Sequence, residues 1–98
     1  MARFTITFLR AAEDDLAWFR ANEREVIYDA AMRILGTDAA TESKRRKRLR
    51  LNPLAPWELR LGPYRVFYEV VGATKVRIVA IGYKQHNALF IRGERMQP

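Results

Sequence analysis

Hydrophobic residues recur with two different periods, and these divide the chain into a helical N-terminal part and a strand-rich C-terminal part. Phe4, Ile6 and Phe8 alternate with threonines, and this period of two predicts a half-buried strand. In residues 9–19 and again in residues 26–35, apolar side chains recur at helical spacing. The pattern therefore predicts one strand followed by two amphipathic helices.

Polar residues and glycine suggest where these helices begin and end. Asn22 is expected to end the first helix, and Gly36 is expected to follow the second as its C′ residue. Glu13, Asp14 and Asp15 are expected on the solvent side of the first helix, in turns where the helix dipole favours negative charge. The short connection between the helices predicts an antiparallel helical hairpin.

Residues 37–56 have the least regular pattern and contain a basic run that is expected to be a short helix or a loop. Pro53 and Pro56 follow this run, and they should end any helix and lead the chain into a strand. The basic residues are Lys44, Arg45, Arg46, Lys47, Arg48 and Arg50.

Residues 57–61 and 64–70 predict two strands joined by the two-residue turn Gly62-Pro63. Glycine followed by proline suits a type II′ turn, since only the first position needs positive φ. Such a turn sets the register, so Arg60 should lie directly opposite Arg65 on the face away from the core. Two guanidinium groups paired in this way repel each other. A bound anion would explain the pair, although two solvated arginines bridged by a carboxylate would also do so.

The C-terminal third predicts two further strands. Residues 76–83 form a long apolar segment expected at the centre of a sheet, residues 84–87 should leave it, and residues 89–91 should form a final short strand. The order β-α-α-β-β-β predicts an α+β fold, in which an antiparallel sheet of about four strands packs against the helical hairpin. Residues 1–98 are expected to form a single domain.

Composition limits the classes of function. Hydrophobic residues make up 49% of the chain, which is enough for a core, and 18 basic against 11 acidic residues give a net charge of +7. A field this positive attracts phosphate backbones or acidic proteins. No apolar run approaches the roughly 20 residues that span a bilayer, and the N-terminus lacks the pattern of a signal peptide. We therefore expect a cytoplasmic protein that does not bind membranes.

The cysteine and histidine counts exclude several kinds of chemistry. Since the sequence has no cysteine, disulfides, zinc–thiolate sites and cysteine nucleophiles are excluded. With His86 as the only histidine, the chain cannot form a site of several histidines. No cofactor and no metal is expected.

Two segments carry a resemblance to a known family. Residues 57–70, WELRLGPYRVFYEV, resemble the signature hairpin of the RelE/ParE toxin superfamily, and residues 81–90, IGYKQHNALF, are similar to its closing segment. The resemblance covers nearly the whole chain. It implies the toxin of a type II toxin–antitoxin system, neutralised by a cognate antitoxin. Two activities occur in the superfamily, namely mRNA cleavage on the ribosome and inhibition of DNA gyrase, and a catalytically weakened member is a third possibility.

For the ribosome-dependent endoribonucleases, the resemblance implies attack of an RNA 2′-OH on the adjacent phosphate. Such a reaction needs positive charge at the phosphate, a base and an acid. The family's cationic positions fall on Arg60, Arg65 and Lys84. Glu58 stands where the family often has a second basic residue, and Phe90 stands where it usually has tyrosine.

The remaining candidates have an ordinary structural interpretation beside the functional one. His86 or Glu58 would handle protons, yet His86 also suits an uninvolved loop position and Glu58 a salt bridge. Tyr83 and Phe90 would stack on an RNA base, yet both also suit a core. Lys84 would otherwise be a surface residue. The basic run, residues 44–50, would grip ribosomal RNA or the antitoxin.

Overall fold

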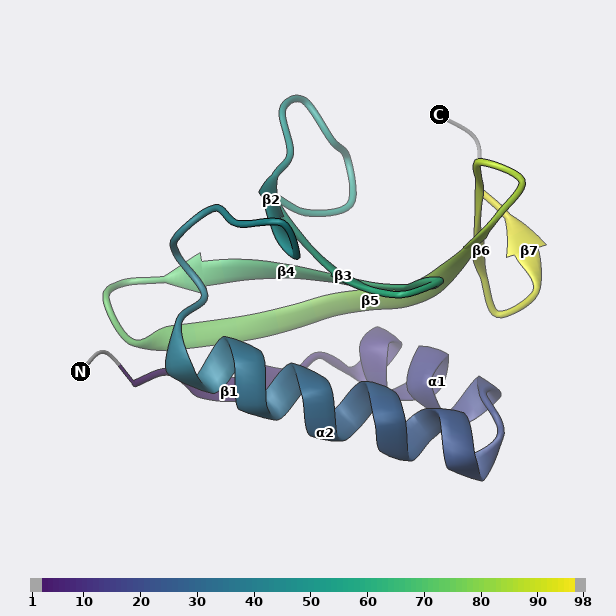
Figure 1. Cartoon of the computed structure of the whole chain (residues 1–98), viewed down its shortest axis with the longest axis horizontal. Helices are drawn as coiled ribbons and strands as arrows, with labels where there is room; N and C mark the ends of the chain where they lie inside the picture. The colour runs from purple at the N-terminus through teal and green to yellow at the C-terminus, as the bar shows by residue number, and fades with distance from the viewer. Residues whose placement is uncertain (1–2, 97–98) are drawn as a thin grey trace.

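Two helices cover one face of a large sheet in the computed structural model, which describes residues 3–96 (Figure 1). Within this range the sheet has seven strands, where the sequence predicted about four. The strands run in the order β2-β3-β4-β5-β6-β7, and β1 pairs with β5 in parallel. The elements are β1 (Thr5–Phe8), α1 (Arg10–Trp18), α2 (Ala21–Thr37), β2 (Arg46–Arg48), β3 (Trp57–Leu61), β4 (Tyr64–Val71), β5 (Lys75–Gln85), β6 (Ala88–Ile91) and β7 (Glu94–Arg95).

The predicted register of the β3–β4 hairpin is confirmed. Arg60 lies opposite Arg65, and Leu59 lies opposite Val66. Gly62 has a φ of 59°, as the first position of a type II′ turn requires. The two-residue turn leaves no freedom in the pairing, so the hairpin places both arginines on one face of the sheet.

Each face of the sheet carries its own apolar cluster. The larger cluster lies between the sheet and the helices, where Leu59, Tyr68 and Ile78 pack with Ile27 and Leu35 of α2. The smaller one lies on the opposite face. It is built around Phe67 and Ala80 of the sheet, Ile91 of β6 and Ala55 of the β2–β3 loop, with Leu49 and Leu54 of that loop packed against it. The second face is therefore partly covered by residues 49–55, whereas the end near the β3–β4 turn carries charged residues.

Several predicted boundaries were wrong. Asn22 lies in the first turn of α2 and does not end α1, because the chain already turns at Phe19 and Arg20. Gly36 lies inside the last turn of α2 and has no positive φ, and the residue after the helix is Asp38. Lys84 still belongs to β5, which continues to Gln85.

The basic run is neither a helix nor a loop throughout, because Arg46–Arg48 form β2 and pair with β3. The free edge of this strand is covered by the segment before it. Ser43 donates its backbone N–H to the carbonyl oxygen of Arg46 at 2.9 Å, and Glu42 accepts the N–H of Arg48 at 3.0 Å. These bonds satisfy groups that a strand edge would otherwise expose, and this explains how a short run of cations forms a strand.

Asp15 is buried rather than solvent-facing, with 2% of its surface exposed. Between its pairing with β1 and its pairing with β6, β5 has a gap along that edge. Asp15 fills the gap, because its carboxylate accepts the backbone N–H of Ile81 at 3.0 Å. The same carboxylate pairs with Arg92 Nε at 3.0 Å. Helix α1 therefore replaces a missing strand at this point and holds the β6–β7 turn.

No helix within residues 3–96 has the length and apolar character needed to cross a bilayer.

Candidate nucleic-acid interface

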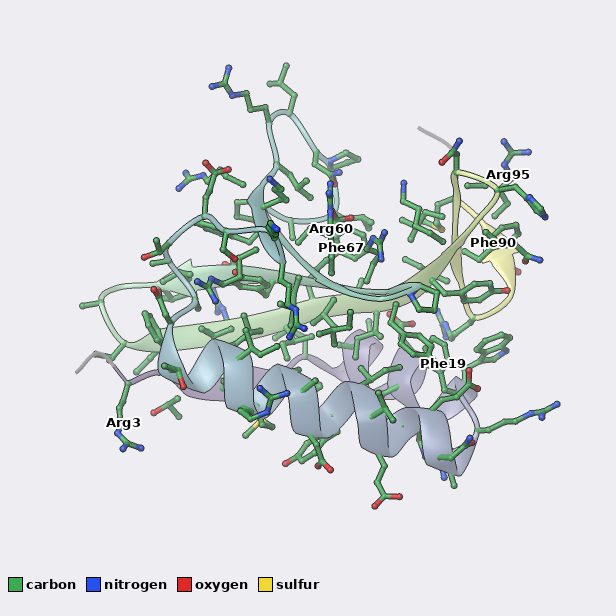
Figure 2. All side chains as sticks on the ribbon, viewed as in Figure 1. Arg3, Phe19, Arg60, Phe67, Phe90 and Arg95 are labelled. Carbon is green, nitrogen blue, oxygen red and sulfur yellow. The ribbon has the colours of Figure 1, made fainter. Side chains whose placement is uncertain are left out.

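Arg60 and Arg65 lie side by side on the sheet face away from the helices. They are cross-strand partners in β3 and β4, and Figure 2 shows Arg60 with Phe67 on the side of the sheet opposite to the helices. Tyr83 packs into the helix-side core, so its neighbour Lys84 in β5 points to the same face as the two arginines. These three cations therefore lie on the same face, on three adjacent strands.

Glu58 holds the two guanidinium groups in place. Its side chain is buried, and Oε1 accepts a hydrogen bond from Arg60 Nε at 2.9 Å. Its other oxygen, Oε2, lies 3.8 Å from Arg65 Nε. Since both arginines turn Nε toward one carboxylate, Glu58 reduces their repulsion while cancelling only one of the two charges.

Arg65 is the more constrained of the two arginines. Its Nη1 donates to the carbonyl oxygens of Gly62 at 2.6 Å and Tyr64 at 2.9 Å, and only 16% of the side chain is exposed. Its Nε is buried and makes no hydrogen bond to any residue of the described range. Burial lowers the pKa of Arg65; the charge of Arg60 adds to this effect and Glu58 opposes it. The group nevertheless stays protonated near neutral pH.

The arrangement fits an anion more closely than a set of solvated side chains. Two arginines and Lys84 against Glu58 leave a surplus of two positive charges, and Lys47, opposite Glu58 in β2, adds a third. Within residues 3–96, Arg60 makes its hydrogen bond through Nε, so its terminal nitrogens remain available to a ligand. A planar guanidinium with available N–H groups beside a second cation matches the geometry of phosphate.

His86, the second predicted proton-transfer group beside Glu58, lies further from the cations. His86 and Asn87 form the two-residue turn between β5 and β6, with φ of 52° and 66°. His86 is exposed and stands two residues beyond Lys84. The structure thus brings His86 to the same end of the sheet as the cations but does not place it in contact with them. Glu58 does contact the cations, but both of its oxygens face the arginines and are not directed toward a ligand.

Tyr83 and Phe90 lie on the opposite face from Arg60 and Arg65. They stack on each other with ring centroids 5.3 Å apart, and Trp18 of α1 stacks on Tyr83 at 5.7 Å. Because its neighbours occupy both faces of its ring, Tyr83 has no free face for a base. The structure does not bring these two aromatic residues together with the cationic group.

The basic run divides into structural and exposed members. Arg46 donates from Nε to the carbonyl oxygen of Thr41, and the Arg48 guanidinium lies 5.5 Å from the ring centre of Trp57. Lys47 sits opposite Glu58 in β2. Lys44, Arg45 and Arg50 are exposed and are the members that suit a polyanion.

Sequence reasoning missed a hollow on the helix side of the sheet, next to the β3–β4 turn. Its residues include Trp18 and Phe19 at the end of α1, and Glu23 and Tyr64, whose side chains share a hydrogen bond of 2.9 Å. The adjacent aromatic residues Trp18 and Phe19 were a signal, but a helix end gives no indication of what it faces. Within the described range, no cluster of histidine and carboxylate side chains could hold a metal ion.

Comparison with known proteins finds a likeness at the level of structure. No family model and no curated protein matches the sequence. The structure is similar to a chain in the crystal structure of the toxin–antitoxin complex RelBE2 from Mycobacterium tuberculosis, with a TM-score of 0.73 and 21% sequence identity. The match covers 85% of this chain and 100% of that chain. The chain therefore has the fold found in the RelBE2 toxin–antitoxin complex, which confirms at the level of the fold the resemblance seen in its hairpin.

Proposed function

We propose that the chain is the toxin of a type II toxin–antitoxin module and acts in the cytoplasm as a ribosome-dependent mRNA endoribonuclease. The observation that carries the proposal is the arginine pair Arg60–Arg65, held by the buried Glu58 beside Lys84. The fold shared with a toxin–antitoxin complex supports the toxin role and a cognate antitoxin partner.

The proposed reaction forms a bond from the RNA 2′-oxygen to phosphorus and breaks the bond from phosphorus to the 5′-oxygen. Negative charge grows on the phosphate as this happens, and the guanidinium groups stabilise it. Arg65 is held rigidly by two carbonyl oxygens, so it needs little reorganisation on binding. His86 is the only histidine of the chain, and its imidazole would move protons once the ribosome and mRNA are bound.

The test is cell-free translation of a reporter with the purified protein, followed by primer extension on the mRNA. Cuts within codons that require ribosomes are expected. Arg65→Ala should reduce cleavage by roughly 100-fold or more, since it removes a charged donor at the phosphate. Arg77→Ala is the matched control, because Arg77 is an exposed β5 arginine paired with Glu69, five residues along the strand from Gly82, which faces Arg65. Equal loss in both variants, or full cleavage by Arg65→Ala, would count against the proposal.

Inhibition of DNA gyrase without catalysis is a second candidate, and one observation favours it. Both oxygens of Glu58 are directed at arginines, so no carboxylate beside Arg65 is placed to act as a base within the described residues. A gyrase inhibitor needs no proton transfer. Intact mRNA together with loss of gyrase supercoiling in a purified assay would select this alternative, and absence of both effects would indicate a catalytically weakened member.

A further inference from the structure

A cavity of about 540 Å³ lies between the α1–α2 junction and the β3–β4 turn. It opens on the helix side of the sheet, where Figure 2 shows Phe19, and thus on the face opposite to Arg60. This volume is in the range of small-ligand sites. The lining residues are Trp18, Phe19, Arg20, Asn22, Glu23, Pro63, Tyr64 and Tyr83.

Packed aromatic rings form the walls of the cavity. Phe19 is buried and meets Tyr64 edge-on, with ring centroids 5.6 Å apart, and it meets Trp18 edge-on at 5.3 Å. Trp18 also stacks on Tyr83, yet 48% of its surface remains exposed. The exposed indole offers a flat apolar surface to a planar ligand.

A few polar groups converge on the same cavity. Glu23 Oε2 accepts the hydroxyl of Tyr64 at 2.9 Å, and Oε1 lies 3.4 Å from the backbone nitrogen of Arg20. Each carboxylate oxygen can accept a further hydrogen bond. Arg20 and the amide of Asn22 are exposed at the rim. The positive charge of Arg20 disfavours a cationic ligand and suits a phosphate. The carboxylate of Glu23 suits a neutral ring with N–H donors, so the two groups together match a nucleotide.

The cavity and the arginine pair share one turn. Pro63 and Tyr64 line the cavity, while Arg65 Nη1 donates to the carbonyl oxygens of Gly62 and Tyr64 on the same turn. A single nucleic-acid strand crossing this turn would meet cations on one face of the sheet and aromatic rings on the other. Single-stranded RNA is recognised in this way, by phosphate contacts together with bases stacked on aromatic side chains.

We propose that this cavity binds one unstacked base of single-stranded RNA, and that Glu23 favours guanine there. The inference rests on the proposed RNA-directed function and adds a base-specific subsite to it. Guanine presents two adjacent donors, N1–H and the 2-amino group, to a carboxylate, whereas uracil presents one N–H. Base stacking on an aromatic platform contributes about 1–3 kcal/mol by alanine substitution.

The test is titration of the isolated protein with GMP, UMP and inorganic phosphate, followed by ¹⁵N NMR. The chain has two indole N–H groups, and that of the buried Trp57 serves as an internal control for Trp18. GMP is expected to shift the Trp18 signal saturably, UMP to bind more weakly, and phosphate to leave Trp18 unmoved. Glu23→Gln keeps an acceptor for Tyr64 but should lower GMP affinity about tenfold, whereas Glu25→Gln, at an exposed α2 position, should not.

Three results would overturn the inference. GMP could shift Trp18 no more than phosphate does, or Glu23→Gln could bind GMP as well as Glu25→Gln does. An antitoxin peptide could also fill the cavity while GMP does not, and the site would then belong to a protein partner. The titration contains no ribosome and measures no cleavage, so its failure is distinguishable from failure of the proposed endoribonuclease activity.

Discussion

At the scale of single residues, Glu58 decides whether the two arginines can share a sheet face. Without its carboxylate, Arg60 and Arg65 would oppose each other across β3 and β4 with nothing between them. The sequence already contained the pair and its repulsion, because the Gly62-Pro63 turn fixes the register. It did not indicate whether Glu58 would act as a base or as a bridge. That distinction depends on where the oxygens point, and both point to guanidinium nitrogens.

Glu58→Ala is expected to destabilise the protein by about 1–3 kcal/mol, as it removes a buried acceptor and leaves two like charges adjacent. The lower half of this range is favoured, because solvent reaches much of the Arg60 side chain and screens its charge. Urea unfolding measures the change. Glu69→Ala is the control, since Glu69 pairs with Arg77 at a more exposed site and should cost less than about 1 kcal/mol. An equal cost in both variants would show that Glu58 has no special role.

Asp15 gives a prediction on pH. Burial raises the pKa of its carboxyl above the ordinary value of 3.8, although the Ile81 amide and Arg92 oppose the rise; Asp14 adds to it. The folded state therefore takes up this proton at a higher pH than the unfolded state does. The stability contributed by protonating Asp15 is present below 3.8 and is lost as pH rises through the raised pKa.

The free energy of unfolding of the wild type minus that of Asp15→Asn should consequently rise as the pH falls from 7 through the raised pKa. It should become constant below about pH 3.8. Urea unfolding of both proteins at several pH values between 3 and 7 provides the measurement. Other groups titrate in both proteins and largely cancel in the difference. A difference that does not vary with pH, or that shrinks on acidification, would contradict the burial effect.

At the scale of elements, local patterns predicted the parts of the fold that local chemistry controls. The β3–β4 hairpin followed from a turn and an alternation, and the helices from their apolar periodicity. Pairing between segments that are distant in sequence could not be predicted from local patterns. β2 is a run of cations that becomes a strand because residues 42 and 43 cover its edge and β3 pairs with it. The sequence predicts Asp15 at the surface, because it does not show the gap between β1 and β6 along the edge of β5.

The hollow beside Trp18 was missed for the same reason, since its walls come from the α1–α2 junction, β4 and β5. By contrast, the cationic site was largely predictable. Arg60 and Arg65 lie on one hairpin, and Lys84 lies on the strand next to it. Tyr83 and Phe90 were assigned to the same site because they are near Lys84 in sequence, but alternation along β5 and its register with β6 place them on the other face.

Two glycines test the packing of these elements. A Cβ on Gly82 would collide with the carbonyl oxygen of Phe90 in β6, whereas one on Gly36 would meet nothing within 4 Å. Gly82→Ala is expected to cost about 2–3 kcal/mol by forcing β5 and β6 apart. Gly36→Ala should add about 0.5–1 kcal/mol, because alanine is favoured in a helix. Thermal unfolding measures both, and effects of the same sign would refute the expected spacing between β5 and β6.

At the scale of the whole molecule, the positive charge is segregated. Residues 1–37, which include β1 and both helices, contain five arginines and six carboxylates, for a net charge of −1. Residues 38–98, which include β2–β7, contain thirteen basic and five acidic residues, for a net charge of +8. The sheet layer and its loops therefore carry the whole excess, and a polyanion should approach from that side.

Reversing charges on one layer only tests this asymmetry. Lys44→Glu/Arg50→Glu should weaken ribosome binding strongly and reduce its dependence on salt, since fewer counterions are released. Arg10→Glu/Arg33→Glu changes the net charge by the same amount on the helices and should have a much smaller effect. Sedimentation with ribosomes at several salt concentrations measures both affinities. Similar losses for the two variants would mean that net charge, and not its location, controls binding.

The parallel pairing of β1 with β5 also has a consequence for how the chain is made. Thr5 finds its partner Lys75 only after a long stretch of intervening sequence, and β6 then closes the same strand further along. Loop closure over such separations is slow compared with local pairing. During synthesis β1 therefore has no pairing partner until residues 75–78 of β5 have been made. We expect the sheet, and with it the cationic surface, to assemble only after β5 has been synthesised.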